Sequence, residues 1–517
     1  MAPATGAPEP LTVSVAEPQS VAAPRLGRGV RVPRLLAAEP SLTLFIAVYA
    51  CVVVALARAE LVPDSWLLLV GGREVARSGL PAHDTLVVLA HGRRWVDQQW
   101  LAQLGAYGLE RAGGVRLALL ALAAASTGAL VLAVAAARTL GASARSIVVV
   151  AAAAVFLAPA ALQLRAQTPA LLLFAALLAL LTRETLRQSR RVLFVFPLLA
   201  LWANVHGSAL MGGAVVLLYA GTVARGQPRR GALLAVTAPL CLLASPYATQ
   251  LPGYYARTVV SPLLAKYSQE WQPLSWSHGK AFLLAVLAAL WLVARHGRRL
   301  PLFAQVTFAL TAVAAIAAVR NLVWLELSLV GFAPSALDAL WQPPARRGRH
   351  PLGVVWLGAA AAVGAVVVTV VVASRPAAWF ESQWDVHAAA ATARALAADP
   401  RARVFASDEY TDWLLWKEPA LRGRLAYDAR FELLTRAQLE SVSTGRRAFA
   451  ARFPVALLDR EQDAAAARAL ERRGYRRVYA RGSALLLARN CAIAGRSAGS
   501  RTRSQCDASA ISSVSAP

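Results

Sequence analysis

Acidic and aromatic side chains gather in one polar stretch, residues 60–116, directly after the first long apolar segment. The side chains there that could take part in catalysis or binding are Asp64, Trp66, His83, Asp84, Trp95, Asp97 and Trp100. Ionisable groups are costly to dehydrate at a bilayer boundary, so carboxylates beside an apolar segment indicate a candidate functional site. A carboxylate within reach of a hydroxyl can take up its proton.

The elements that position these groups are two expected amphipathic helices. Asp64 opens a stretch to Gly79 with apolar residues at helical spacing, and residues 95–111 form a second stretch that carries aromatic side chains. Such helices lie flat in the membrane interface, where Trp and Tyr are favoured. A structural alternative stands beside the functional one: Asp64 caps a helix, and Asp84 stabilises the turn between the helices.

Composition places the rest of the chain in a membrane. Of 517 residues, 57% are hydrophobic and only 16% are charged, whereas soluble domains are about 45–50% apolar. A span needs roughly 20 apolar residues. Eleven candidate runs begin near Leu42, Leu117, Ser146, Pro169, Val192, Ser208, Gly231, Ala281, Leu300, Leu322 and Leu352. The sequence therefore predicts an α-helical polytopic protein with about eleven transmembrane helices.

The net charge of +26 does not indicate nucleic-acid binding, because the arginines lie mainly in alternate turns between the apolar runs. This distribution indicates how the chain is oriented in the membrane. On the expected cytoplasmic side the arginines are Arg25, Arg28, Arg31, Arg34, Arg138, Arg145, Arg183, Arg187, Arg190, Arg191, Arg225, Arg229, Arg230, Arg295, Arg298, Arg299, Arg346, Arg347 and Arg349. By the positive-inside rule the amino terminus is inside and the carboxyl terminus outside. The expected location is a plasma membrane, and the resemblance to bacterial proteins given below implies a bacterial inner membrane.

The chain divides into four expected regions. Residues 1–40 form a flexible cytoplasmic tail, 41–374 the membrane domain with outer loops 60–116 and 246–280, 375–490 a small extracytoplasmic α/β domain, and 491–517 a disordered tail. Within the α/β domain we expect strands at 402–406, 424–427, 455–458 and 477–480, and helices at 408–416 and 461–473. Cys51 and Cys241 are expected core thiols, and Cys491 and Cys506 could pair outside.

Short motifs along the chain resemble multispanning bacterial glycosyltransferases of the GT-C class. In the first outer loop these are Asp64-Ser65-Trp66, Gly79-Leu80-Pro81-Ala82-His83-Asp84 and Gly92-Arg93-Arg94-Trp95. Further matches are Arg165-Ala166-Gln167, Trp202-Ala203-Asn204-Val205-His206-Gly207, Glu270-Trp271, Arg320-Asn321, the segment from Asp412 to Trp416, and Tyr427-Asp428-Ala429-Arg430-Phe431. The resemblance covers most of the chain, and its closest form is an uncharacterised branch of the class.

The resemblance implies a GT-C-like fold and a sugar donor carried on a polyprenyl phosphate. It makes an aspartate of the first outer loop, Asp64 or Asp84, the candidate catalytic base. The departing polyprenyl phosphate needs cations, and Arg165, His206 and Arg320 lie at expected outer ends of spans. Arginine suits that task because its planar fork pairs with phosphate oxygens.

Several of these residues have simpler interpretations. Arg165 and Arg320 can mark span ends by snorkelling, His206 can bond a neighbouring carbonyl, and Asn204 can support helix packing. Glu270 can be a surface residue or can contact substrate or a divalent cation. The class implies no certain cofactor.

Two residues after the membrane domain, Asp428 and Arg430, are expected to form a local ion pair that does not approach the first loop.

The resulting hypothesis is an inverting membrane glycosyltransferase, a hexosyl- or pentosyltransferase that works on an extracytoplasmic glycan, lipid or protein acceptor. His83, Arg165, Asn204, His206, Glu270 and Arg320 are its candidate substrate-binding residues. One alternative is a non-catalytic membrane scaffold with an outer interaction module. A transporter is the other, and it would require mid-span charges or broken paired helices. Apart from Glu326, early in the tenth run, the apolar runs show no such acid near the middle of a span.

Overall fold

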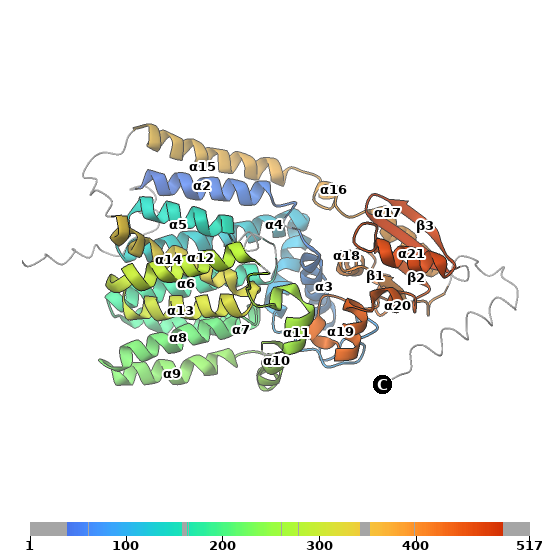
Figure 1. The fold of residues 1–517 in the computed structure, drawn as a ribbon, viewed down its shortest axis with the longest axis horizontal. Helices are drawn as coiled ribbons and strands as arrows, with labels where there is room; N and C mark the ends of the chain where they lie inside the picture. Colours follow the sequence, from blue (N-terminus) through green and yellow to red (C-terminus); the bar gives the residue numbers. More distant parts are fainter. Residues whose placement is uncertain are drawn as a thin grey trace, which may run out of the picture.

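The structure, a computed structural model, describes residues 39–59, 61–157, 163, 165–259, 261–277, 279–341, 352–397 and 399–489. The two expected tails, with Cys491 and Cys506, lie outside these residues except for Glu39 and Pro40. A bundle of helices occupies one end of the molecule and a small sheet the other, with short helices between them (Figure 1).

The bundle helices coincide with the eleven apolar runs. They are α2 (Pro40–Ala55), α4 (Trp100–Thr139), α5 (Ala144–Leu157), α6 (Gln167–Leu186), α7 (Val195–Val205), α8 (Ala209–Ala224), α9 (Pro228–Leu242), α12 (Lys280–His296), α13 (Leu302–Ala317), α14 (Leu322–Trp341) and α15 (Leu352–Ala373). Five helical stretches among the described residues are long and apolar enough to cross a membrane: those containing α4, α6, α12, α14 and α15. The others are shorter, so the count of eleven crossings stays a prediction.

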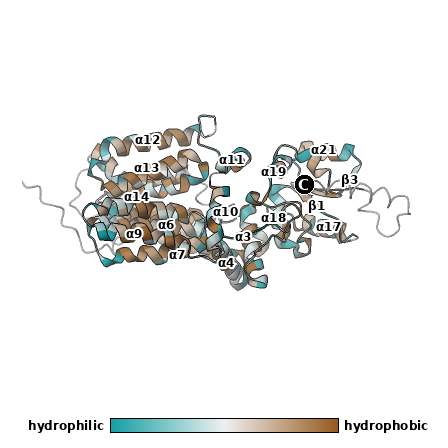
Figure 2. Cartoon of the chain, turned by 90° about the horizontal axis from the view of Figure 1, so that it is seen from below, coloured by the Kyte–Doolittle hydropathy of each residue, from teal (hydrophilic) through white to brown (hydrophobic). Residues whose placement is uncertain are grey.

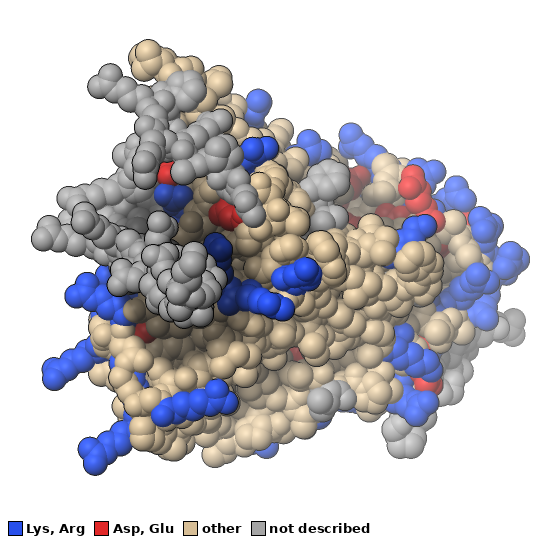
Figure 3. All heavy atoms as spheres, turned by 60° about the vertical axis from the view of Figure 1, so that its left-hand side comes forward, with Lys and Arg blue, Asp and Glu red and all other residues tan. Residues whose placement is uncertain are grey.

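Hydrophobic residues predominate along the bundle helices, and hydrophilic residues are frequent at the end of the bundle far from the sheet (Figure 2). At the end far from the sheet, Arg138 pairs with Glu39 at 2.8 Å, and Arg230 pairs with Glu184 at 2.8 Å. Figure 3 shows Lys and Arg side chains around this end, beside a broad uncharged surface. Turns expected on one side of the membrane therefore do share one end of the bundle.

Helix α4 is two helices joined at a glycine. Gly113 and Gly114 leave helical geometry, and Gly114 has φ 74°, a left-handed value that favours glycine. The part before this kink packs against α3 (Pro63–Ser78), and Gly72 of α3 has no room for a side chain beside the backbone of Gln103. The predicted second amphipathic helix thus begins at Trp100 and not at Trp95.

The outer segments between the bundle and the sheet are short. They comprise α3, α10 (Leu251–Thr258), α11 (Pro262–Tyr267) and the 3-10 turns η3 (Ala248–Gln250), η4 (Gln269–Trp271) and η6 (Val319–Asn321). The remaining 3-10 turns are η2 (Arg190–Phe194), η5 (Gly297–Arg299), η7 (Pro419–Leu421) and η8 (Phe431–Leu433).

The carboxyl-terminal part contains a four-stranded sheet. Its strands are β1 (Val404–Ala406), β2 (Val455–Asp459), β3 (Tyr475–Arg481) and β4 (Ala484–Arg489), and its helices are α16 (Ala377–Phe380), α17 (Val386–Ala397), α18 (Asp408–Lys417), α19 (Arg436–Ser443), α20 (Arg446–Ala450) and α21 (Ala464–Arg472). The order is β1-β2-β4-β3, with β1 parallel to β2 and the other pairs antiparallel.

The prediction of a strand at 424–427 is wrong, and β4 was not predicted. Leu425 makes single parallel bridges to Val404 on one side and to Val87 of the first outer loop on the other. Val88 N–H also donates to the Leu425 carbonyl at 2.8 Å. Through these bridges the segment around Leu425 lies beside β1, and the segment around Val87 lies beside Leu425. The first outer loop therefore joins the edge of the carboxyl-terminal sheet.

Candidate functional site

Three charged side chains from three distant segments meet where the bundle faces the outer segments. Asp64 lies in the first turn of α3, Arg165 precedes α6, and Glu270 lies in η4. Arg165 Nε is 3.6 Å from Asp64 Oδ2, and its Nη1 pairs with Glu270. We call these residues the Asp64 cluster. Arg165 bridges two carboxylates and so orients both.

The Asp64 cluster is open to solvent but lies against protein. The Asp64 side chain is 42% exposed and that of Glu270 is 41% exposed. Burial raises the pKa of Asp64, Arg165 opposes this rise, Glu270 adds to it, and Arg320 opposes it. A carboxylate whose pKa is raised while it remains accessible is a stronger base than an ordinary aspartate.

Arg320 supplies a cation without a counter-ion beside the cluster. It lies in η6, and its guanidinium stacks on the ring of Trp271 at 4.2 Å. Within the part of the chain that the structure describes, Arg320 has no ion pair and no hydrogen bond. A partly buried guanidinium held against an aromatic ring with its donors unused is suited to an incoming anion.

His206, in the turn between α7 and α8, is neutral. Its Nδ1 accepts a hydrogen bond from Ser208 N–H at 3.1 Å. Burial, with a smaller effect of Arg320, lowers the pKa of His206 to about 3. His206 therefore offers a hydrogen bond and not the cation that the sequence suggested, because burial disfavours a charged imidazole and the charge of Arg320 adds to this effect.

Asp84, the second candidate base, lies in a buried ion pair. Its side chain is 0% exposed, Oδ1 is 2.5 Å from Arg430 Nη2, and Oδ2 accepts from Val87 N–H at 3.2 Å. Arg430 also pairs with Asp428 and stacks on Trp95 at 4.2 Å. The expectation that Arg430 stays away from the first loop is wrong. With both oxygens engaged, Asp84 serves structure in this conformation.

Two further predicted residues lie apart from the Asp64 cluster. Asn204 accepts a hydrogen bond from Trp100 Nε1 at 2.9 Å and donates to the carbonyls of Ala200 and Ala244. These contacts occupy its amide and indicate a packing role. The side chain of His83 is exposed on the first loop.

Residues that sequence reasoning missed surround a cavity of about 300 Å³ at the outer face. They come from the first outer loop, α10 and η8: Arg93, Arg94, Val96, Tyr254, Arg257, Thr258, Glu432, Leu433 and Leu434. Arg93 and Arg94 lie within the motif Gly92-Arg93-Arg94-Trp95, but that motif assigns them no role, and no local motif marks Arg257. The cavity exists because three segments far apart in sequence come together.

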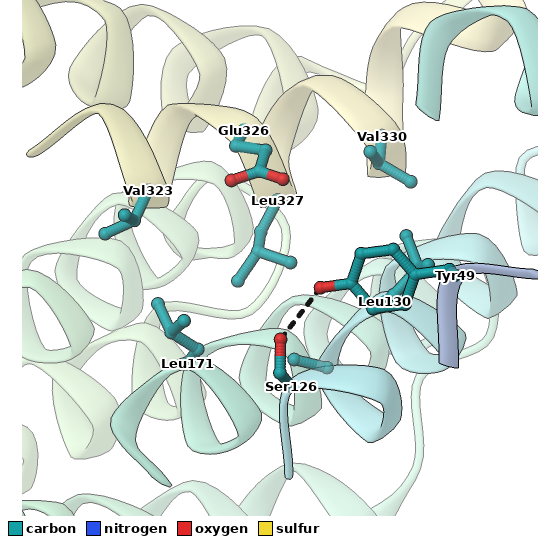
Figure 4. A pocket seen from close by; sticks show the side chains of 9 residues that line it. Tyr49, Ser126, Leu130, Leu171, Val323, Glu326, Leu327 and Val330 are labelled. Carbon is teal, nitrogen blue, oxygen red and sulfur yellow. Dashed lines mark hydrogen bonds between the residues drawn. The ribbon is translucent and has the colours of Figure 1, made fainter. Parts of the chain in front are cut away.

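A second cavity lies inside the bundle beside Glu326 (Figure 4). Its volume is about 10 Å³, room for one water molecule. Tyr49 and Ser126 hydrogen-bond each other at 2.8 Å across it. A sugar cannot enter a space of this size.

No group of three or more His, Cys, Asp or Glu side chains among the described residues is placed to hold a metal ion. Glu270 of the Asp64 cluster is already paired with Arg165.

Comparisons with known proteins complete the description. No family model and no curated protein matches the chain. Among solved structures, it is similar to the Archaeoglobus fulgidus oligosaccharyltransferase in the apo form, with 11% identity, TM-score 0.49, and coverage of 81% of this chain and 70% of that chain. It is similar to ArnT from Cupriavidus metallidurans bound to undecaprenyl phosphate, with 16% identity, TM-score 0.47, and coverage of 86% and 97%. At such identities and TM-scores, neither similarity assigns an activity or a site.

Proposed function

We propose that the protein is an integral membrane glycosyltransferase that moves a sugar from a polyprenyl-phosphate donor to an acceptor on the extracytoplasmic side. The observation that carries the proposal is the position of Arg320, a guanidinium without a counter-ion, next to the Asp64 cluster. A lipid-borne phosphate lies at the headgroup boundary, so its cation and the base must both stand at the end of a transmembrane bundle. Sequence resemblance to the GT-C class points to the same chemistry.

Arg320 takes the phosphate of the donor in this proposal. Stacking on Trp271 fixes the plane of the guanidinium, and its unused N–H donors can meet two phosphate oxygens at once. Neutral His206 stands close enough for Arg320 to affect its pKa and can donate a further hydrogen bond. The polyprenyl chain extends from this point along the apolar bundle.

Asp64 acts as the base. The acceptor hydroxyl oxygen attacks the anomeric carbon, the bond from that carbon to the phosphate oxygen breaks, and the phosphate leaves with the electron pair. Asp64 takes the hydroxyl proton, and Arg165 holds its carboxylate in place. Attack from the face opposite the phosphate inverts the anomeric centre, as the class implies.

The two ends of the bundle face opposite sides of the membrane in this proposal. The arginine-rich end of the bundle is cytoplasmic, and the Asp64 cluster, the 300 Å³ cavity and the carboxyl-terminal sheet are extracytoplasmic. All eleven bundle helices cross the membrane.

The experiment is a transfer assay with purified protein in vesicles and a panel of polyprenyl-phosphate sugars. Arg320→Lys keeps the charge but loses the planar fork, and we expect at least about tenfold weaker donor use with unchanged folding. Arg298→Lys, at the opposite end of the bundle, is the matched control. Full activity of Arg320→Lys would remove the phosphate role, and no transfer by the unaltered protein across the panel would support the scaffold alternative.

A further inference from the structure

The 300 Å³ cavity at the outer face has an excess of positive charge. Arg93, Arg94 and Arg257 line it, and among the lining residues that the structure describes Glu432 is the one acid. Arg93 donates through Nη1 to the Leu433 carbonyl at 2.6 Å. Within the described residues, the guanidinium groups of Arg94 and Arg257, both exposed residues, have no hydrogen bond and no ion pair. Three guanidinium groups around one cavity repel one another unless an anion joins them.

These arginines differ from an ordinary solvated charge run because two segments far apart in sequence supply them, and a third supplies the acid. The first outer loop contributes Arg93 and Arg94, α10 contributes Arg257, and η8 contributes Glu432. The first loop is also fixed against η8 by the bond from Arg93 to Leu433. The charges are therefore arranged by tertiary structure.

Polar groups on the cavity wall can also recognise hydroxyls. Tyr254 accepts a hydrogen bond from Gln98 Nε2 at 3.0 Å, so its own O–H remains available to donate. Glu432 can accept from a hydroxyl in either protonation state. A carboxylate, arginines and a tyrosine hydroxyl in about 300 Å³ fit one sugar ring that bears an oxyanion, at the lower end of the usual size of ligand sites.

Arg320 connects the cavity with the Asp64 cluster. Burial is the main cause that raises the pKa of Asp64 and the pKa of Glu432, and the charge of Arg320 opposes the rise at both. One side chain therefore acts electrostatically on both places.

We propose that this cavity is a subsite for an acidic acceptor sugar, one that carries a carboxylate or a phosphate group. The proposal rests on the proposed function. The arginines bind the oxyanion, and Glu432 and Tyr254 bind ring hydroxyls. The acceptor is thereby held with another hydroxyl directed toward Asp64.

The test measures binding, which does not require transfer. Titration calorimetry on the purified full chain in detergent uses methyl glucuronide, glucose 6-phosphate, methyl glucoside, inorganic phosphate and a short-chain polyprenyl phosphate. The variant is Arg94→Gln/Arg257→Gln, and the matched control is Arg468→Gln, an exposed arginine of α21. We expect the variant to bind one or both acidic sugars at least about tenfold more weakly, and the control to bind like the unaltered protein.

The comparison of ligands separates the possible sources. Weaker acidic-sugar binding with unchanged polyprenyl-phosphate binding supports the subsite, whether or not transfer is ever detected. The relative affinities of methyl glucuronide and glucose 6-phosphate distinguish carboxylate from phosphate recognition. Three results would each overturn the proposal. Methyl glucoside could bind as tightly as the acidic sugars, or inorganic phosphate could bind as tightly as both acidic sugars. The third is that the variant loses polyprenyl-phosphate binding and keeps acidic-sugar binding.

Discussion

Arg430 Nη2 lies 2.5 Å from Asp84 Oδ1, across 346 positions of sequence. Both side chains are almost fully buried, at 4% and 0% exposure. This ion pair fastens the first outer loop to the carboxyl-terminal region, beside the bridge between Val87 and Leu425. The first loop, the cavity and the sheet therefore belong to one folded unit.

The first prediction concerns this ion pair. Arg430→Gln leaves Asp84 and Asp428 buried without their cation and should cost about 3–5 kcal/mol of stability. Thermal unfolding in detergent, followed by loss of the monodisperse peak, measures it. Arg436→Gln removes an arginine that is 71% exposed and pairs with Glu440, and it should change the midpoint little. Equal midpoints for the two variants would contradict the structural role of Arg430.

A second prediction concerns pH and Asp97. Burial raises the pKa of Asp97 to about 7, and Arg430 and Gln103 only partly oppose it. The native state therefore retains a proton that the unfolded chain loses above a pH of about 4. The contribution of Asp97 to stability falls as the pH rises from about 4 to 7 and is constant above that.

Asp97→Asn removes this penalty, because an amide carries no charge. It should raise the unfolding midpoint at pH 8 and change it little at pH 4, whereas Glu461→Gln, at an exposed position, should do neither. Unfolding scans across this pH range make the measurement. A midpoint for Asp97→Asn that falls at pH 8 would show that the ionised carboxylate is stabilising.

The third prediction is the sidedness of the membrane domain. Ser78→Cys and Ser382→Cys are at exposed positions of the outer region, and Gly226→Cys is at an exposed position between α8 and α9. In intact cells, a membrane-impermeant thiol reagent should modify the first two and spare the third until the membrane is opened. The reverse pattern would place the Asp64 cluster in the cytoplasm.

Sequence reasoning succeeded where the signal is local and periodic. Long apolar runs specify buried helices, so the bundle helices could be placed. Asp64 and Arg165 were chosen from motifs that resemble the GT-C class, and the structure brings their side chains to 3.6 Å, while their role stays a prediction. The strand expected at 424–427 failed because Leu425 makes only single bridges to its neighbours. Its apolar character reflects burial between two segments and not a continuous ladder.

The rest of the site depends on contacts between distant segments. Nothing near Arg430 in sequence indicates that it reaches Asp84, and nothing near Arg257 indicates that it faces the same cavity as Arg94. The neutrality of His206 likewise follows from burial and from Arg320, which is 114 positions away in the numbering of the chain. A single sequence carries no local record of such pairings.

The central claim is that Asp64 is the base. Asp64→Asn keeps the size of the side chain, and Asp64 is the second residue of α3 and not its N-cap, which is Val62, so folding should survive. An amide cannot take up the proton, so transfer should fall on the order of 10²-fold or more.

The deciding measurement is sugar transfer from a lipid-linked donor by vesicles with equal amounts of folded protein and Asp64→Asn. Asp408→Asn, in the carboxyl-terminal region where Asp408 pairs with Arg446 at 2.5 Å, is the matched control and should transfer at the unaltered rate. A loss of about 10²-fold confined to Asp64→Asn is the predicted result. Equal transfer by Asp64→Asn and the unaltered protein would contradict the proposal that Asp64 accepts the proton.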